Sequence, residues 1–332
     1  MSDERTGAKI VVIGGGTGSF GILSGLKHYT NHITALVNMA DDGGSTGQLR
    51  DELGVLPPGD VRQCLVALSE APVVRDLFNY RFHDGTLRGH AFGNLFLAAL
   101  EQMSGSFAEA VELASQVLNI VGHVEPITLT NVTLCVEGQD GEAVRGQHAV
   151  TEQVTAVRPR VWLEPEAVAN PQALAAIAKA EIVVIAPGLL YGSLAPALVV
   201  PGVYDALKKS KAVKVYIANL VTKPDATQGF KVHDFADEIE RLAGGPFLDY
   251  VIYNSDLPGQ ALLEKYAYEG ECAVEVDTEA LATRHYKAKA ARLLAAAAWD
   301  GAQEADPLAG SRSFIRHDPD QSARAIMRLY FS

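Results

Sequence analysis

The stretch Lys9–Gly21, KIVVIGGGTGSFG, decides the fold of this 332-residue chain. Its first five residues are mostly β-branched and apolar, which predicts a short buried strand that ends at glycine. Apolar residues then recur at helical spacing over Phe20–His28, and Ile33–Met39 (ITALVNM) is a second apolar run typical of a strand. A strand, a glycine loop, a helix and a second strand begin a parallel sheet, so we expect an α/β fold.

Helices and strands alternate again in the second half of the chain. The patterns predict helices that lead into strands at Glu181–Ala186, Val213–Asn219 and Asp249–Asn254, and each strand ends in a loop of Gly, Pro, Asn or Ser. Ligands bind beyond the carboxyl ends of strands in such sheets, so these loops are the expected place for a site.

Two other regions depart from this alternation. Thr128–Glu137 and Ala143–Glu164 are rich in Val and Thr, which predicts antiparallel hairpins. The Ala-rich Lys287–Trp299 and the later Gln321–Tyr330 predict helices, with Asp300–Ser313 as a loop between them. We therefore expect one domain over residues 1–332. It should be a Rossmann-like, doubly wound, mostly parallel sheet, with a β-rich insertion at about 124–164 and a helical tail at about 287–332.

Composition narrows the function. The chain has 28 basic and 40 acidic residues, a net charge of −12, which argues against a DNA or RNA partner because such proteins carry a basic footprint. Three distant cysteines show no metal or disulfide spacing and favour a reducing compartment. Neither a signal-like segment nor a membrane-spanning run is visible. We expect a cytoplasmic protein without membrane insertion.

The first glycine loop is a candidate phosphate site. Glycines allow close backbone approach, and the start of the following helix offers free N–H groups to an anion. A plain tight turn is the competing interpretation, and the missing lysine excludes a Walker A loop. The candidate residues are Gly14, Gly15, Gly16, Thr17 and Gly18.

A second loop, Asp41–Gly47 (DDGGSTG), follows the second predicted strand. Carboxylates beside bound phosphates are typical partners of Mg²⁺, so Asp41 and Asp42 are candidate metal ligands or ribose contacts. A helix cap on a surface turn is the alternative. The phosphate contacts expected from this loop are Gly43, Gly44, Ser45 and Thr46.

Further candidates lie at other helix starts and strand ends. Asp60 can act as a cap or a site residue, so the catalytic candidates are Asp41, Asp42 and Asp60. Arg62 is unfavourable in a first helical turn unless an anion is near. His90 and Asn94 share a helix face if their helix begins early. The remaining candidate ligand contacts are Pro187, Gly188, Tyr191 (stacking on a base or sugar), Asn219 and Lys223.

Taken in order, these motifs resemble the YvcK/CofD-like (gluconeogenesis factor) family. The segments that carry the likeness are IGGGTG (13–18), ADDGGSTGQLR (40–50), LPPGDVRQCLVAL (56–68), LFNYRF (77–82), GHAFGNLFLAAL (89–100) and PGLLYGSLAP (187–196). Arg316, in Arg316-His317-Asp318, matches a short family motif. Leu189 and Gly192 depart from the usual PGSLYTS pattern of the family, which puts hydroxyl contacts from this loop in doubt.

The resemblance implies a Rossmann-like fold and two functional branches. Gluconeogenesis factors bind UDP-sugars such as UDP-N-acetylglucosamine and regulate carbon flux to cell wall synthesis and cell shape, and the PPGD, YRF and GHAFGNL segments are closer to this branch. CofD-like proteins are Mg²⁺-dependent transferases that move 2-phospho-lactate from a nucleotide-diphosphate carrier. An NAD(P)-dependent oxidoreductase is a third reading of the G-x-G-x-x-G match. Turnover, base preference, a homodimer and an unidentified protein partner stay open.

Overall fold

The computed structural model describes residues 7–153, 157–224, 226–295 and 315–331 of the chain. Its main element is a seven-stranded sheet in the order β10-β9-β8-β7-β1-β2-β3, with every neighbouring pair parallel. The predicted Rossmann-like α/β fold is therefore confirmed. The strands are β1 (Ile10–Gly14), β2 (Ile33–Val37), β3 (His123–Pro126), β7 (Ile182–Ile185), β8 (Val213–Ile217), β9 (Tyr250–Asn254) and β10 (Lys287–Ala291).

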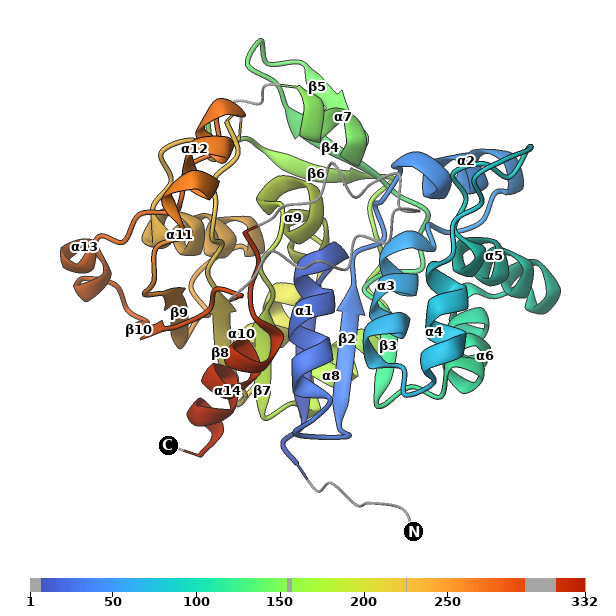
Figure 1. Cartoon of the computed structure of the whole chain (residues 1–332), viewed down its shortest axis with the longest axis horizontal. Helices are drawn as coiled ribbons and strands as arrows, with labels where there is room; N and C mark the ends of the chain where they lie inside the picture. Colours follow the sequence, from blue (N-terminus) through green and yellow to red (C-terminus); the bar gives the residue numbers. More distant parts are fainter. Residues whose placement is uncertain (1–6, 154–156, 225, 296–314, 332) are drawn as a thin grey trace.

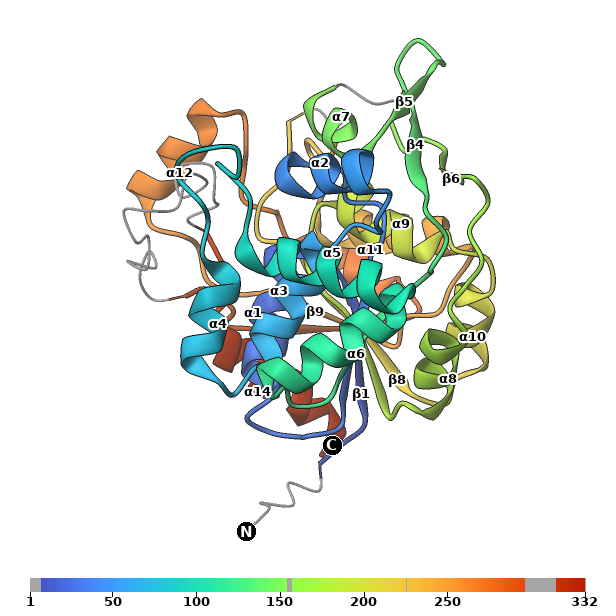
Figure 2. The same ribbon diagram turned by 90° about the vertical axis from the view of Figure 1, so that its right-hand side faces the viewer.

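A smaller antiparallel sheet, in the order β5-β4-β6, consists of β4 (Thr133–Glu137), β5 (Ala143–Arg145) and β6 (Val161–Glu164). The short helix α7 (Gln147–Glu152) lies between β5 and β6. Figures 1 and 2 both show this sheet beyond the carboxyl ends of the parallel strands. The predicted β-rich insertion thus exists, and it overhangs the edge where a ligand is expected.

Helices cover both faces of the parallel sheet (Figure 2). Helices α1, α3 and α14 pack together on one face, whereas α8, α9 and α10 pack on the other. The helices are α1 (Gly16–Leu26), α2 (Gly44–Leu53), α3 (Gly59–Leu68), α4 (Pro72–Asn79), α5 (Phe92–Ser104), α6 (Phe107–Leu118), α8 (Pro171–Lys179), the π-helical turn η1 (Leu190–Leu194), α9 (Ala195–Leu198), α10 (Val203–Lys209), α11 (Val232–Ala243), α12 (Gln260–Tyr268), α13 (Thr278–Ala282) and α14 (Pro319–Tyr330).

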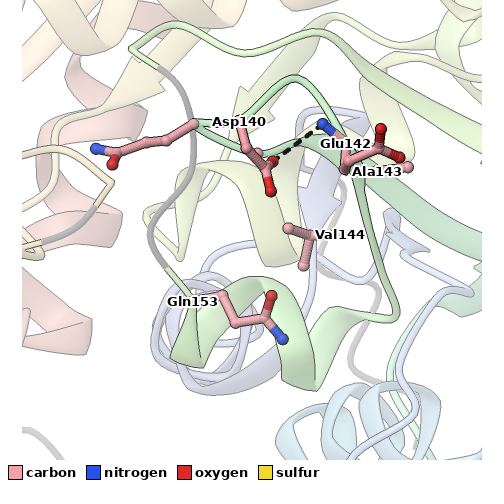
Figure 3. A pocket seen from close by; sticks show the side chains of 7 residues that line it. Asp140, Glu142, Ala143, Val144 and Gln153 are labelled. Atoms are coloured by element: carbon pink, nitrogen blue, oxygen red, sulfur yellow. Dashed lines mark hydrogen bonds between the residues drawn. The ribbon is translucent and has the colours of Figure 1, made fainter.

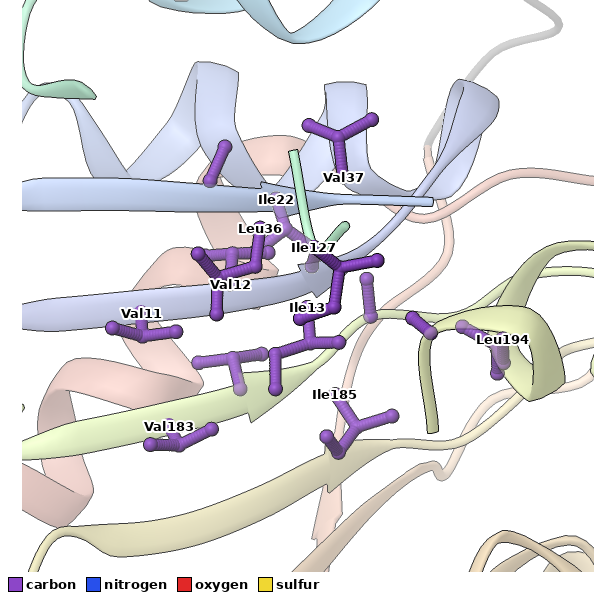
Figure 4. Packing of buried hydrophobic residues seen from close by; sticks show 14 of the residues in the cluster. Val11, Val12, Ile13, Ile22, Leu36, Val37, Ile127, Val183, Ile185 and Leu194 are labelled. Carbon is purple, nitrogen blue, oxygen red and sulfur yellow. The ribbon is translucent and has the colours of Figure 1, made fainter. Parts of the chain in front are cut away.

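The core lies between the sheet and its helical layers. Strands β1 and β7 are buried along their whole length, as expected for central parallel strands that read as continuous apolar runs. Figure 4 shows their side chains packed with Ile22 of α1, Leu36 of β2 and Leu194 of η1. The apolar runs recognised in the sequence therefore form the centre of the sheet.

The chain reverses its winding direction between β1 and β7. From β1 it passes through α1 to β2 on one side, whereas β7 is followed by β8 and β9 on the other side. Ligand sites of open α/β sheets lie at such a switch point, beyond the carboxyl ends of the strands. The loops after β1, β2 and β7 meet at this point.

Three sequence predictions need correction. The helix predicted over Lys287–Trp299 is wrong, because Lys287–Ala291 is edge strand β10 and residues 296–299 lie outside the described part. Pairing with β9 outweighs the helix propensity of alanine, and lysines are common on edge strands. The insertion begins later than 124, because His123–Pro126 (β3) is the other edge of the parallel sheet. The hairpin predicted at Ala143–Glu164 contains helix α7.

Two further predictions concern the C-terminal segment and membrane insertion. The final predicted helix is confirmed as α14, but the loop predicted at Asp300–Ser313 lies outside the described residues. Within the described ranges no single helix is long and apolar enough to cross a membrane. One bent pair, Leu190–Leu198 with Val203–Lys209 at 73°, passes that test of length and composition only when its two helices are combined.

Candidate functional site

Three helices begin at glycine-rich loops without a side-chain cap. Helix α1 starts after Gly15, α2 after Gly43 and α3 after Pro58, and none of these N-cap residues accepts a side-chain cap bond. Elsewhere α6, α8, α13 and α14 are capped by Ser106, Asn170, Asp277 and Asp318. Uncapped helix starts present N–H groups and a partial positive charge, which favour an anion.

The three helix starts contact one another. The Gly16 N–H donates a hydrogen bond of 2.9 Å to Oδ1 of Asp60 at the start of α3. A Cβ on Gly15 would lie 2.2 Å from Asp60 Oδ2, and a Cβ on Gly59 would lie 2.5 Å from Asp41 Oδ2. Glycine is therefore required for the loops to approach these carboxylates. The two glycine loops, which follow the neighbouring strands β1 and β2, therefore lie together.

Two carboxylates, the buried Asp60 and the half-buried Asp41, lie at the centre of these contacts. Burial raises the pKa of Asp60 to about 7, and the neighbouring Asp41 raises it as well. Burial also raises the pKa of Asp41, while hydrogen bonds from Gly43 and Thr46 favour its charged form. A pair of close, buried carboxylates is costly unless it shares a proton or binds a cation.

Buried polar atoms without a hydrogen bond gather around the first glycine loop. They are Ser19 Oγ, Asn38 Nδ2 and Asp60 Oδ2. The Asn38 side chain lies near the Asp60 carboxylate, but neither of the two atoms makes a hydrogen bond of good geometry. Orphaned buried groups of this kind need an explanation, and a bound ion or ligand is one.

The pair formed by Asp41 and Asp60 fits a Mg²⁺ ion. This ion is commonly held by one or two carboxylates together with substrate phosphates and water. Among the described residues no three His, Cys, Asp or Glu side chains group as a metal cluster, so phosphate and water oxygens would complete the shell. The bound ion would neutralise phosphate charge, and the two aspartates would hold it.

Asp42, also a candidate metal ligand, is engaged elsewhere. Its Oδ1 accepts a hydrogen bond of 2.8 Å from the His148 N–H at the start of α7. A Cβ on Gly146, whose φ is 93°, would lie 2.3 Å from Asp42 Oδ2. Gln147 Nε2 in turn donates to the Gly192 carbonyl in the loop after β7. Asp42 therefore links the β-rich insertion to the site.

Arg62 is buried in α3 and forms a network with side chains of α4 and α5. Its Nε donates to Asn94 Oδ1 at 2.9 Å, and its Nη1 donates to Asn79 Oδ1 at 2.6 Å. Asn94 Nδ2 donates to Ser45 Oγ, which also lies 3.0 Å from His90 Nδ1. The expected shared helix face is wrong, because α5 begins at Phe92 and His90 precedes it. Both residues still reach Ser45.

The loop after β7 contributes backbone more than side chains. A Cβ on Gly18 would lie only 1.7 Å from the Pro187 carbonyl oxygen, so α1 packs directly on this loop. Asn219 Nδ2 donates to the Gly188 carbonyl at 2.7 Å and ties the loop to the end of β8. The Tyr191 side chain is 2% exposed, and its hydroxyl donates to the buried Glu238 at 2.9 Å, so it does not face a base or sugar.

The remaining predicted contacts, Thr17, Lys223 and Arg316, differ in their surroundings. Thr17 is exposed in the first turn of α1. Lys223 forms an ion pair with Glu271, and among the described residues none of its hydrogen bonds joins it to a glycine loop. Arg316 is partly exposed, and its carbonyl accepts from the Ala295 N–H. Lys223 is therefore engaged with Glu271 rather than with the carboxylate pair.

Two surface pockets lie away from these loops. One, of about 260 Å³, is lined by the turn Gly138–Val144 and by Gln153, where Asp140 Oδ1 accepts from the Glu142 N–H (Figure 3). The other, of about 360 Å³, lies at the amino ends of β1 and β2 beside α8. Their linings include no glycine-loop residue, and the convergent carboxylates and helix starts are the stronger candidate.

Comparison with known proteins agrees with this architecture. A family model described as 2-phospho-L-lactate transferase CofD matches residues 10–294. A putative gluconeogenesis factor of Clostridium acetobutylicum is 39% identical over 326 residues, covering 97% of this chain and 69% of that protein. The gluconeogenesis factor of Bacillus subtilis is 42% identical over 277 residues, covering 82% of this chain and 87% of that protein.

Solved structures give the same result. The crystal structure of protein BH3568 from Bacillus halodurans aligns with a TM-score of 0.87 at 36% identity, covering 97% of this chain and 100% of that one. A second structure of that protein, described as a member of the UPF0052 family, aligns with a TM-score of 0.86. The chain belongs to the CofD/UPF0052 family, and its relatives of about 40% identity are gluconeogenesis factors.

Proposed function

We propose that this protein binds a nucleotide diphosphate at the loops after β1, β2 and β7, with a UDP-sugar such as UDP-N-acetylglucosamine as the ligand. In this role it acts as a gluconeogenesis factor that regulates carbon flux to cell wall synthesis and cell shape. The names of its relatives support the gluconeogenesis role. The UDP-sugar and the cell-wall role rest on the family resemblance alone.

One observation carries the binding proposal: the uncapped starts of α1, α2 and α3 converge on Asp41 and Asp60 at the switch point of the sheet. Helix starts favour phosphate oxygens, whereas a carboxylate pair repels them. A Mg²⁺ ion between the carboxylates and the phosphates reconciles these opposite charges. The diphosphate and the ion are therefore proposed together.

A Mg²⁺-dependent 2-phospho-lactate transferase is the second candidate, favoured by the family model that matches residues 10–294. Transfer from a diphosphate carrier needs mainly positioning and charge neutralisation, and this set of loops offers both. An NAD(P)-dependent oxidoreductase gains no support from the names of the relatives above.

Calorimetric titration tests the proposal with UDP-N-acetylglucosamine, UDP, GDP and NAD, each with and without Mg²⁺. UDP-N-acetylglucosamine should bind tighter than NAD and should not be consumed. Gly43→Val places a side chain at the start of α2, where Gly43 has an ordinary φ of −78°, and should weaken binding about tenfold or more. Gly21→Ala, with no atom within 4 Å of the added Cβ, is the matched control.

Two results contradict the proposal. If the Gly43→Val protein and the control bind the nucleotide with equal affinity, the phosphate does not lie at the start of α2. Rapid Mg²⁺-dependent transfer of phospho-lactate from a GDP carrier to a deazaflavin alcohol would establish the transferase instead.

A further inference from the structure

A chain of side-chain hydrogen bonds ends at the Ser45 hydroxyl in the first turn of α2. It runs from Arg62 Nε to Asn94 Oδ1 at 2.9 Å, and from Asn94 Nδ2 to Ser45 Oγ at 3.3 Å. His90 Nδ1 approaches the same oxygen at 3.0 Å from the other end. Asn94 is 3% exposed and His90 is 8% exposed, whereas Ser45 is only partly buried. The network therefore begins at buried side chains and ends at the hydroxyl of a partly buried serine.

The direction of the first two bonds is fixed by chemistry. A guanidinium group has five donors and no acceptor, so Arg62 must face the carbonyl oxygen of the Asn94 amide. The Asn94 NH₂ group then points at Ser45, and Ser45 Oγ accepts this bond. One proton remains on the hydroxyl, and His90 decides where that proton is directed.

The imidazole of His90 can take two forms at Nδ1. If Nδ1 is bare, it accepts the Ser45 proton, and the hydroxyl then has none to offer to a ligand. If Nδ1 carries hydrogen, it donates to Ser45 Oγ, and the hydroxyl proton is free to turn to an anion. A phosphate oxygen only accepts hydrogen bonds, so it selects the second form.

We propose that Ser45 donates its hydroxyl proton to a phosphate oxygen of the bound nucleotide, and that Asn94 and His90 are positioning residues that release this proton by donating to Ser45 Oγ. The proposal rests on the proposed nucleotide-binding function. It assigns Arg62 an indirect role: the arginine orients the Asn94 amide that faces the serine. Ligand binding then favours the Nδ1–H tautomer of the neutral His90 ring, in which Nδ1 takes up a proton from water while Nε2 gives its proton to water, so the ring keeps one proton.

Nuclear magnetic resonance of protein labelled with ¹⁵N-histidine tests the proposal, with His90→Gln used to assign the His90 signals. UDP-N-acetylglucosamine with Mg²⁺ should change His90 Nδ1 from a bare to a protonated nitrogen. Ser45→Ala should abolish this change and weaken binding about tenfold, the range of a hydrogen bond to a charged group.

A second pair of variants separates positioning from folding and from charge. The Asn94→Asp side chain still accepts from Arg62 but cannot donate to Ser45. Its carboxylate instead accepts a hydrogen bond from the Ser45 hydroxyl, so nucleotide affinity should fall as it does in Ser45→Ala. Asn79→Asp adds the same charge beside Arg62 without touching Ser45 and should change affinity less than threefold. Thermal melting checks that all variants fold.

The outcomes are distinguishable. If wild-type protein binds none of the nucleotides, the proposed function fails before this inference is reached. If the nucleotide binds but His90 Nδ1 keeps its state, or if Ser45→Ala binds as tightly as wild type, the inference is wrong while the binding function stands. Equal losses in Asn94→Asp and Asn79→Asp would assign the effect to charge alone and would also overturn it.

Discussion

Three acidic side chains that look alike in the sequence have different surroundings in the structure. Asp60 is buried and Asp41 is half-buried beside it at the glycine loops, whereas Asp42 accepts from the His148 N–H of the β-rich insertion. Adjacent residues point in different directions, so the neighbouring pair of acids in the sequence is not the pair in space. The structure therefore places Asp41 beside Asp60, and the metal role of these two aspartates remains part of the proposal above.

Asp60→Asn tests this pairing through stability. The folded-state pKa of Asp60, about 7, lies above its ordinary value of 3.8, so its contribution is present at low pH and is lost as pH rises through 7. Without divalent cations the free energy of unfolding of the variant should exceed that of wild type by about 2–4 kcal/mol at pH 8. Near pH 4 the two values should be nearly equal. Urea unfolding in EDTA measures both.

Magnesium provides the control for the same variant. Added Mg²⁺ should stabilise wild type at pH 8 by binding only the folded state, and should leave Asp60→Asn nearly unchanged. A wild-type protein that is as stable as the variant at pH 8 in EDTA would show that the two carboxylates do not repel one another.

At the scale of elements, helix α1 is pressed against the loop after β7. Gly18 and Gly21 both lie in this helix, yet only Gly18 faces the Pro187 carbonyl, 1.7 Å from the position of an added Cβ. This contact joins the loops on the two sides of the switch point. Gly18, one of the glycines that suggest a nucleotide fingerprint, thus also serves the packing of α1 on this loop.

Gly18→Ala should accordingly destabilise the protein by about 1–3 kcal/mol or more, because the backbone must move to relieve the overlap. Gly21→Ala, which meets no atom within 4 Å, should stabilise it by about 0.5–1 kcal/mol through helix propensity. Chemical unfolding of both variants measures the difference, and similar values for the two would mean that Pro187 yields easily.

Local sequence patterns correctly predicted those helices and strands whose own residues determine their secondary structure. The buried strands that begin at Ile10 and Ile182 were predictable because central parallel strands are continuous apolar runs. Strand β10 was not, since Lys287–Ala291 is Ala-rich and becomes a strand only by pairing with β9. Pairing partners distant in the chain leave no local trace.

The site shows the same division. The glycine loops and Asp41 were predicted because motif and position coincide, and their convergence follows from the order of the strands. The contact of Ser45 with His90 could not be predicted, because it joins residues 45 apart through side-chain direction alone. Tyr191 misled for the same reason: its hydroxyl meets Glu238, a partner 47 residues away.

At the scale of the whole molecule, the last helix, α14, packs against the first helix, α1. Helix α14 packs on α1 (Figure 1), and a Cβ on Gly25 would lie 2.1 Å from the Pro319 carbonyl. Just before α14, His317 Nε2 donates to the Ala218 carbonyl at the end of β8 at 3.0 Å. His317 thus joins the segment before α14 to the carboxyl end of β8.

This histidine should make stability depend on pH. Burial lowers the pKa of His317 from 6.5 to about 4, while the bond to Ala218 opposes the shift. The folded state therefore keeps the ring neutral where the unfolded chain binds a proton. The contribution of His317 to the free energy of unfolding is complete above pH 6.5 and is lost as pH falls toward 4.

His317→Gln keeps an N–H donor for Ala218 but cannot titrate. Between pH 7 and pH 5 wild type should lose about 2 kcal/mol relative to this variant. Asp60 acts in the opposite sense over the same range, so only the difference between the two proteins isolates His317. Urea unfolding at the two pH values gives this difference. A constant difference would mean that water reaches the ring and that His317 titrates as in the unfolded chain.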